Sequence, residues 1–279
     1  MRHVLMRSAL VFGALALFAL LLAFASAPAA TLRIGSDVSG APFEYFADGS
    51  KVPLGFDIDL AHALAAKLGA PVTIVNHQFD DLLAAVGRGQ FDAAFSAISD
   101  TSGREKLVSF VDYFIAGGGI IVAQGNPLRI FGLDALCGYA VTTEAGTSYE
   151  ADLKSQSANC TAVGLGPIRI LSYPTDDQAF AAFIAGKAPA YVADYPVDVY
   201  RSRNANEGKA LEVVGRQFDV VPYGIAVAKS NSALLAQVQR ALLAVVADGT
   251  YDRLLKKWGL QQGSLRFAPI NAGKLYEGK

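Results

Sequence analysis

The sequence is poor in the residues that build metal sites and nucleic-acid interfaces. Its 279 residues include only two cysteines and three histidines, and their spacing matches no metal-binding motif. Lysine and arginine number 24 against 25 aspartates and glutamates, so no basic excess points to nucleic acid. No second long apolar run follows the one near the N-terminus, which argues against a further helical membrane span. We therefore expect no cofactor, no metal and no nucleic-acid partner.

The N-terminal apolar run has the form of an export signal. Two arginines and a histidine lie within the first seven residues, and the stretch 9–24 carries no charge. Small residues with A-x-A cleavage patterns follow at 25–29. Residues 1–29 are therefore predicted to be a secretory signal peptide. An uncleaved membrane anchor is the alternative, which the short run and its small-residue exit disfavour.

Both cysteines, Cys137 and Cys160, lie in the part of the chain that would be exported. A disulfide closing that loop fits an oxidising compartment. Two free buried thiols remain the alternative.

The rest of the chain alternates strand and helix patterns, which predicts an α/β class with largely parallel sheets. The first series comprises a strand at 31–36, a hairpin around 48–50, a helix at 56–68 ending at Gly69, a strand at 71–75, a helix at 80–88 and a strand at 91–95. The second comprises a strand at 139–143, a helix from Thr147, a strand at 168–173, a helix at 175–185 and strands at 190–193 and 211–214. Helices at 232–246 and 249–258 and an irregular tail at 261–279 close the chain.

Two extended segments are predicted to connect the two series. The stretch 110–123 carries the glycine run 117–119, which would tolerate backbone rotation, and 223–228 could cross back. Two lobes joined by two strands is therefore the expected architecture.

The stretch 92–106 suggests a binding function. A short apolar strand runs into a cluster of hydroxyls that includes Ser96 and Ser99, and Arg104 follows in the first turn of a predicted helix. Hydroxyls, free backbone N–H groups and a guanidinium in one small volume form a receptor for a carboxylate. A capped helix with an exposed arginine is the alternative.

Five motifs in order resemble the polar amino-acid family of periplasmic solute-binding proteins of ABC transporters. They are G-S-D-V-S-G-A-P-F-E-Y (35–45), G-F-D-I-D-L-A (55–61), G-R-G-Q-F-D-A (87–93), T-S-G-R-E-K (101–106) and D-G-T-Y-D-R-L-L-K-K-W (248–258). The resemblance covers about residues 31–260. It implies the bilobal type II periplasmic-binding-protein fold, with lobe 1 formed by 30–117 plus 224–279 and lobe 2 by 118–223. One ligand would be held in the interlobe cleft.

The resemblance also implies how the ligand's charged ends are held. Arg104 resembles the arginine that pairs with the α-carboxylate, and Ser99 would accompany it. Thr147 and Ser148 would hold the carboxylate from the second lobe, at a helix N-terminus. Asp194, at the end of a strand, resembles the carboxylate that receives the α-ammonium. On the residues alone, Thr147 could be an ordinary helix cap and Asp194 a surface-loop aspartate.

The ligand's side chain is less well defined by the sequence. Phe79 resembles the aromatic residue that packs on it, although in isolation it could be a core residue. Asp37 could meet a polar or cationic side chain, or could cap the turn at 41–42. Ser96 and Ala97 complete the predicted ligand-binding set.

Four departures from the family pattern put side-chain specificity in doubt. Gly40 stands where many members carry a stacking aromatic residue, and Ala97 removes a hydroxyl or replaces a glycine. Tyr149 is bulky where smaller polar residues are common, and Pro189 replaces a usual aspartate.

The predicted function is therefore a periplasmic substrate-binding component that captures a polar amino acid and delivers it to a membrane permease. We expect a monomer without enzymatic activity. An accessory or sensory binding protein is one alternative. A periplasmic dehydratase on the same fold is another, but Asp37, Glu44 and Glu144 are not spaced like a catalytic pair.

Overall fold

The computed structural model describes residues 30–276, so the predicted signal peptide at 1–29 lies outside the described residues. The chain from Thr31 onward forms one compact unit. In the described part, no helix has the length and apolarity needed to cross a bilayer.

The first α/β group is built on β1 (Leu32–Ser36). It lies between two parallel neighbours, β5 (Val72–Asn76) and β6 (Ala93–Ala94). Helices α2 (Phe56–Leu68) and α3 (Phe79–Gly87) connect these strands. The predicted helix at 56–68 is confirmed, and Gly69 ends it in the left-handed conformation that glycine adopts at low cost.

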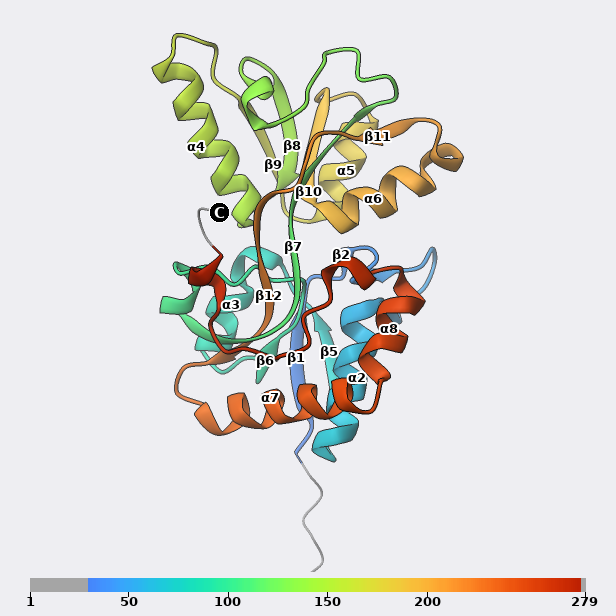
Figure 1. Ribbon diagram of the computed structural model, residues 1–279, viewed down its shortest axis with the longest axis vertical. Coiled ribbons are helices and arrows are strands. Elements are labelled where there is room, and N and C mark those ends of the chain that lie inside the picture. The colour runs from blue at the N-terminus through green and yellow to red at the C-terminus, as the bar shows by residue number, and fades with distance from the viewer. Residues whose placement is uncertain (1–29, 277–279) are drawn as a thin grey trace, which may run out of the picture. The chain divides into compact units, whose positions relative to one another are not determined.

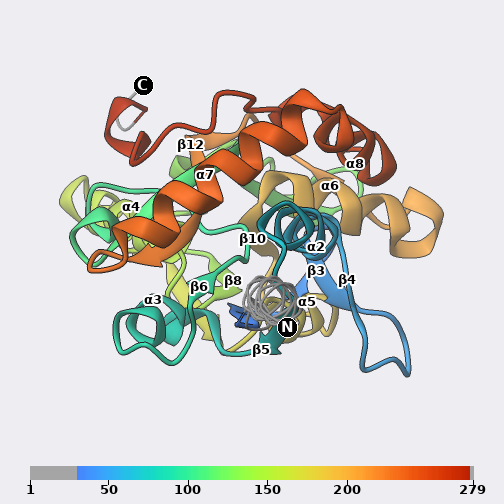
Figure 2. The same ribbon diagram turned by 90° about the horizontal axis from the view of Figure 1, so that it is seen from below.

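The predicted hairpin is also confirmed. Strands β2 (Ser39–Gly40), β3 (Glu44–Phe46) and β4 (Pro53–Leu54) form a small antiparallel sheet. Near the C-terminus, α7 (Ser232–Ala247) and α8 (Thr250–Trp258) pack against α2, as Figure 2 shows from below.

The second group has three mutually parallel strands, β8 (Ala140–Glu144), β9 (Arg169–Tyr173) and β10 (Ala190–Asp194). Its helices are α4 (Ser148–Ala162), α5 (Asp176–Ile184) and α6 (Tyr195–Asn204). The sequence pattern predicts no element between 194 and 210, so α6 is a correction. Its apolar periodicity is weak, and proline stands in its first turn, where the missing N–H costs nothing.

Two long strands connect the groups, as predicted. β7 (Val108–Ala123) and β12 (Phe218–Ala228) run antiparallel, side by side, between them (Figure 1). Among the described residues the sheet order is β5-β1-β6-β12-β7-β10-β8-β9, with β11 (Leu211–Val213) also paired to β7.

The glycine run 117–119 in β7 does not serve the backbone rotation that the sequence predicts. None of its three residues has a left-handed φ angle, so their backbone conformation does not require glycine. A Cβ on Gly118 would lie 2.3 Å from the ring of Phe218, and one on Gly119 would lie 2.4 Å from Asp198 Oδ2. These glycines let β12 and α6 approach the strand closely.

The predicted irregular tail is packed into the fold. It contains two short 3₁₀ turns, Gln261–Gly263 and Gly273–Leu275. The backbone N–H of Phe110 donates to Asn271 Oδ1 at 2.7 Å, which ties the tail to β7.

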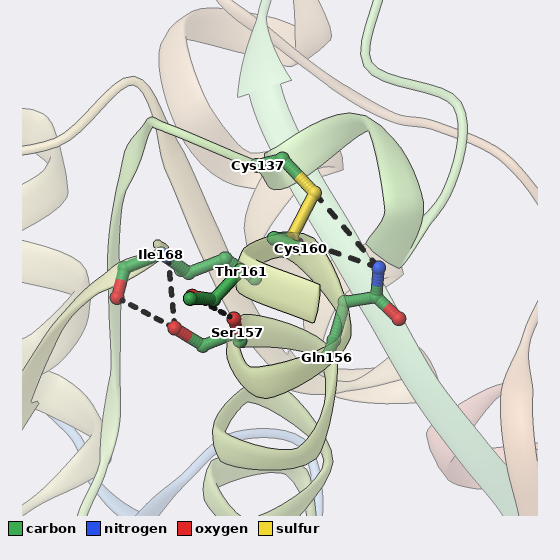
Figure 3. Close-up of a disulfide and its surroundings, with 6 residues drawn as sticks. All are labelled: Cys137, Gln156, Ser157, Cys160, Thr161 and Ile168. Atoms are coloured by element: carbon green, nitrogen blue, oxygen red, sulfur yellow. Dashed lines mark hydrogen bonds between the residues drawn. A yellow bond between two sulfur atoms is a disulfide. The ribbon is translucent and has the colours of Figure 1, made fainter. Parts of the chain in front are cut away.

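Cys137 and Cys160 form a disulfide (Figure 3), with their Cα atoms 5.5 Å apart. The bond joins the segment before β8 to the C-terminal end of α4. Ser157 adds a second tie on the same helix, since its Oγ accepts from the N–H of Ile168 at 3.0 Å. The disulfide and this hydrogen bond therefore fix the C-terminal half of α4, and the N-terminus at Ser148 is the start of a firmly anchored helix.

Candidate functional site

All the ligand-binding residues predicted from the sequence line one cavity between the two α/β groups. They are Asp37, Phe79, Ser96, Ala97, Ser99, Arg104, Thr147, Ser148 and Asp194. Most follow the carboxyl ends of β1, β6, β8 and β10, which is where α/β sheets place ligands. The sequence-predicted set therefore comes together in space.

Arg104 reaches across the cavity. It lies in η1 (Arg104–Lys106), a single 3₁₀ turn rather than the predicted longer helix. Its Nη1 donates to the carbonyl of Ser99 at 2.9 Å, and its Nη2 donates to the carbonyl of Gly146 at 3.0 Å, on the opposite side. Its guanidinium carbon lies 5.4 Å from the centre of the Phe79 ring, within cation–π range. Two of the five guanidinium N–H groups are used in these bonds, which leaves three for a ligand.

The N-terminus of α4 lies at the same cavity. Thr147 is its N-cap, because its hydroxyl accepts from the N–H of Glu150 at 3.1 Å. The same hydroxyl donates to the carbonyl of Glu144 at 2.9 Å. Ser148 Oγ lies 3.2 Å from Ser99 Oγ, so the two sides of the cavity touch here.

Asp194 ends β10, as predicted, and two tyrosines hold it. The hydroxyls of Tyr149 and Tyr223 both donate to its Oδ1, that of Tyr149 at 2.9 Å. Burial raises the pKa of Asp194 to about 6, although these hydrogen bonds oppose the rise. The bulky Tyr149, a departure from the family pattern, therefore serves to position this carboxylate.

Asp37 is held by local hydrogen bonds. Its Oδ1 accepts from the hydroxyl of Ser39, and its Oδ2 accepts from the N–H of Phe79, the first residue of α3, at 3.1 Å. Burial raises its pKa to about 6. The carboxylate thus meets the start of α3 rather than the turn at 41–42.

Ser96 and Ala97 form the floor beside it. Ser96 Oγ accepts from the N–H of Asp37 at 2.9 Å and donates to Glu44 Oε1 at 3.2 Å. Ala97 has a φ of 43°, in the left-handed region that disfavours side chains. This explains why glycine suits the position, and alanine bears a cost of about 1–2 kcal/mol there.

Several cavity residues were not predicted as site residues. They are Ser39, Gly40, Glu44, Glu144, Tyr149, Asp176 and Val197. Asp176 begins α5 and is paired with Arg201 of the unpredicted α6, whose Nε donates to it at 3.1 Å. The same arginine donates from Nη2 to the carbonyl of Ser39 at 3.1 Å, on the other side of the cavity. Only the position of α6 in space could have revealed this pair.

The cavity is rich in carboxyl groups. Asp37, Glu44, Glu144 and Asp194 line it together with the paired Asp176, whereas Arg104 is the one cation among the lining residues described. Burial raises the pKa of Glu144 well above its usual value, and the neighbouring carboxylates raise it further. Such a cavity favours a ligand with more than one cationic group.

Comparison with known proteins identifies the family. The model described as bacterial extracellular solute-binding proteins, family 3, matches residues 32–261, so the chain belongs to that family. The arginine-binding protein ArgT of Corynebacterium glutamicum is 33% identical over 241 residues, covering 86% of this chain and 78% of that protein. ABC transporter arginine-binding protein 1 of Escherichia coli is 31% identical, covering 88% and 98%.

A solved structure agrees. An ancestral arginine-binding protein bound to arginine superposes with a TM-score of 0.75 at 34% identity, covering 82% of this chain and 97% of that one. The expected α/β class and bilobal periplasmic-binding-protein fold are thereby confirmed.

Proposed function

We propose that this protein is the periplasmic substrate-binding component of an ABC transporter. It captures an amino acid in the cavity between its two α/β groups and delivers it to the membrane permease. The observation that carries the proposal is the placement of Arg104 and Asp194, opposite charges suited to the two ends of an amino acid, in one cavity.

The α-carboxylate lies against Arg104 and the N-terminus of α4. The free guanidinium N–H groups and the backbone N–H groups at the helix start supply donors for both of its oxygens. The α-ammonium lies against Asp194, which Tyr149 and Tyr223 hold in place. Closure buries these charges, and a ligand lacking either end would leave one buried group unpaired.

The side chain of the ligand is cationic, and arginine is the best candidate. Asp37, Glu44 and Glu144 line the cavity in addition to Asp194, so carboxyl groups remain to face a side-chain cation after one has met the α-ammonium. Gly40, which stands where many family members carry a stacking aromatic residue, lines the same cavity, and a Cβ added to it would lie 3.3 Å from Glu44 Oε1. The two curated relatives compared above are both named as arginine-binding proteins, which supports the assignment.

The remaining expectations complete the proposal. Residues 1–29 direct export, and the mature protein acts in the periplasm as a monomer without enzymatic activity. Lobe 1 comprises 30–117 plus 224–279 and lobe 2 comprises 118–223, with β7 and β12 as the hinge between them.

Isothermal titration of the exported protein with arginine, lysine, glutamine and citrulline tests the proposal. Citrulline matches arginine in shape but lacks the side-chain charge, so it should bind at least tenfold more weakly, a difference of about 1.4 kcal/mol. Arginine at 100 times its dissociation constant should stabilise the protein by about 2.7 kcal/mol in thermal unfolding. No binding of any amino acid would overturn the proposed function.

A further inference from the structure

Behind the cavity, Glu44 touches a second carboxyl group, that of Asp57. Glu44 lies on β3 and lines the cavity, whereas Asp57 lies in the first turn of α2 and does not line it. Their exposed fractions are 3% and 1%. The hydroxyl of Ser96 donates to Glu44 Oε1 at 3.2 Å, and the N–H of the next residue, Ala97, donates to Asp57 Oδ2 at 2.8 Å, so the two carboxyl groups lie next to each other. Glu44 Oε2 and Asp57 Oδ1 have no hydrogen-bond partner among the described residues, which leaves these two buried oxygens able to share a proton.

Two carboxyl groups can share a hydrogen bond only when one of them carries a proton. Ionising both in a buried contact would place two negative charges together, so the pair retains one proton at neutral pH. Burial raises the pKa of both groups, that of Asp57 to about 7. The pair therefore carries one negative charge, and the position of its proton decides which residue bears that charge.

The surroundings place the negative charge on Asp57. Its Oδ2 accepts from the hydroxyl of Tyr113 on β7 at 2.7 Å and from the N–H of Ala97 at 2.8 Å. Both bonds favour its ionised form, so the proton lies on Glu44. Glu44 receives one bond from Ser96 Oγ, and the nearby carboxylates Asp37 and Asp194 oppose its ionisation.

None of the ion pairs among the described residues includes Glu44 or Asp57. No cation within the protein therefore fixes the proton on one side, and a cation that enters the cavity can move it.

We propose that Glu44 and Asp57 form a proton-sharing pair through which the cavity adapts to the charge of the ligand's side chain. A cationic side chain beside Glu44 moves the proton from Glu44 to Asp57, which leaves a carboxylate facing the cation. A neutral side chain leaves the proton on Glu44, which then faces it as an uncharged carboxyl group that can accept a hydrogen bond. The proton stays within the pair, so no net proton is released. Asp57 is a positioning residue, and the inference rests on the proposed function.

Two isosteric substitutions test the pair in opposite directions. In Asp57→Asn, the amide oxygen can keep the bonds to Tyr113 and Ala97, and the amide N–H₂ donates to Glu44, which stays ionised. In Glu44→Gln, the cavity side is permanently neutral. The readout is the ratio of the dissociation constants of citrulline and arginine, measured by titration calorimetry.

Asp57→Asn should raise this ratio, because Glu44 is then ionised before arginine binds. The increase should be on the order of tenfold for each unit by which the pKa of Glu44 exceeds that of Asp57 in the wild type. Glu44→Gln should lower it. A purely structural role for Asp57 would weaken both ligands equally and leave the ratio unchanged.

Tyr113→Phe provides a second variant if Asp57→Asn does not fold. It removes one hydrogen bond to Asp57, so the proton moves to Asp57 more easily and the ratio should rise, though less than in Asp57→Asn. An unchanged or lowered ratio in folded Asp57→Asn or Tyr113→Phe would overturn the inference while arginine binding by the wild type still stood. If the wild type bound no amino acid, the proposed function itself would fail.

Discussion

Replacing Arg104 by alanine should abolish most ligand binding while leaving the fold intact. The guanidinium bridges the two sides of the cavity through the carbonyls of Ser99 and Gly146, and three of its N–H groups remain for the ligand carboxylate. Truncating one partner of a buried, hydrogen-bonded charge pair costs about 2–5 kcal/mol. At about 1.4 kcal/mol per decade, the affinity for arginine should fall by roughly 30-fold to several thousand-fold.

The ligand offers a matched test of the same contact. Agmatine is arginine without its carboxylate, so the wild type should bind it far more weakly than arginine. If Arg104 receives the carboxylate, Arg104→Ala should bind both ligands with similar affinity. A thermodynamic cycle of the two proteins and the two ligands then gives the coupling free energy between Arg104 and the carboxylate. This coupling should equal most of the binding free energy that Arg104→Ala loses for arginine. Arg104→Lys keeps the charge but lacks the planar fork, so it should retain part of the affinity.

Titration calorimetry gives the dissociation constants, and thermal unfolding without ligand shows whether the variants fold. Of the two carbonyls that Arg104 releases, that of Gly146 lies in an exposed turn and can bond to water, whereas Ser99 is buried. The variant should therefore still fold, with a loss of about 1–3 kcal/mol in unfolding free energy for the unpaired Ser99 carbonyl. Wild-type affinity in Arg104→Ala, or an undiminished preference for arginine over agmatine in that variant, would refute the carboxylate assignment.

Two further predictions concern stability. The disulfide joins residues separated by 23 positions, so Cys137→Ser with Cys160→Ser should lower the unfolding free energy by about 3 kcal/mol in denaturant titration. Arginine affinity should persist in the folded variant, because the bond lies at the end of α4 away from the cavity; a large loss of affinity would contradict this. Gly119→Ala places a methyl group 2.4 Å from a carboxylate oxygen of α6 and should cost about 1–3 kcal/mol. Gly87→Ala, in open space on α3, is the matched control and should be neutral or slightly stabilising.

Much of the fold follows from local patterns. The helix at 56–68 is predicted to its last residue because apolar spacing, early acidic residues and a final glycine all agree. The candidate site is largely predictable because its residues follow the ends of strands, where motif positions map directly onto one edge of a sheet.

The α/β alternation and the connecting strands follow from the sequence alone, because each depends on residues close together in the chain. The two charged ends of the proposed clamp, Arg104 and Asp194, are predictions that come from the resemblance of their motifs to the family.

The pairing of buried groups depends on the three-dimensional arrangement of the elements. Asp57 lies behind Glu44, and Arg201 reaches Asp176 from a helix whose weak periodicity hides it. Gly119 is required by a carboxylate of that helix rather than by its own backbone angles. These contacts join residues distant in sequence, and their energies come from burial, which no single segment specifies.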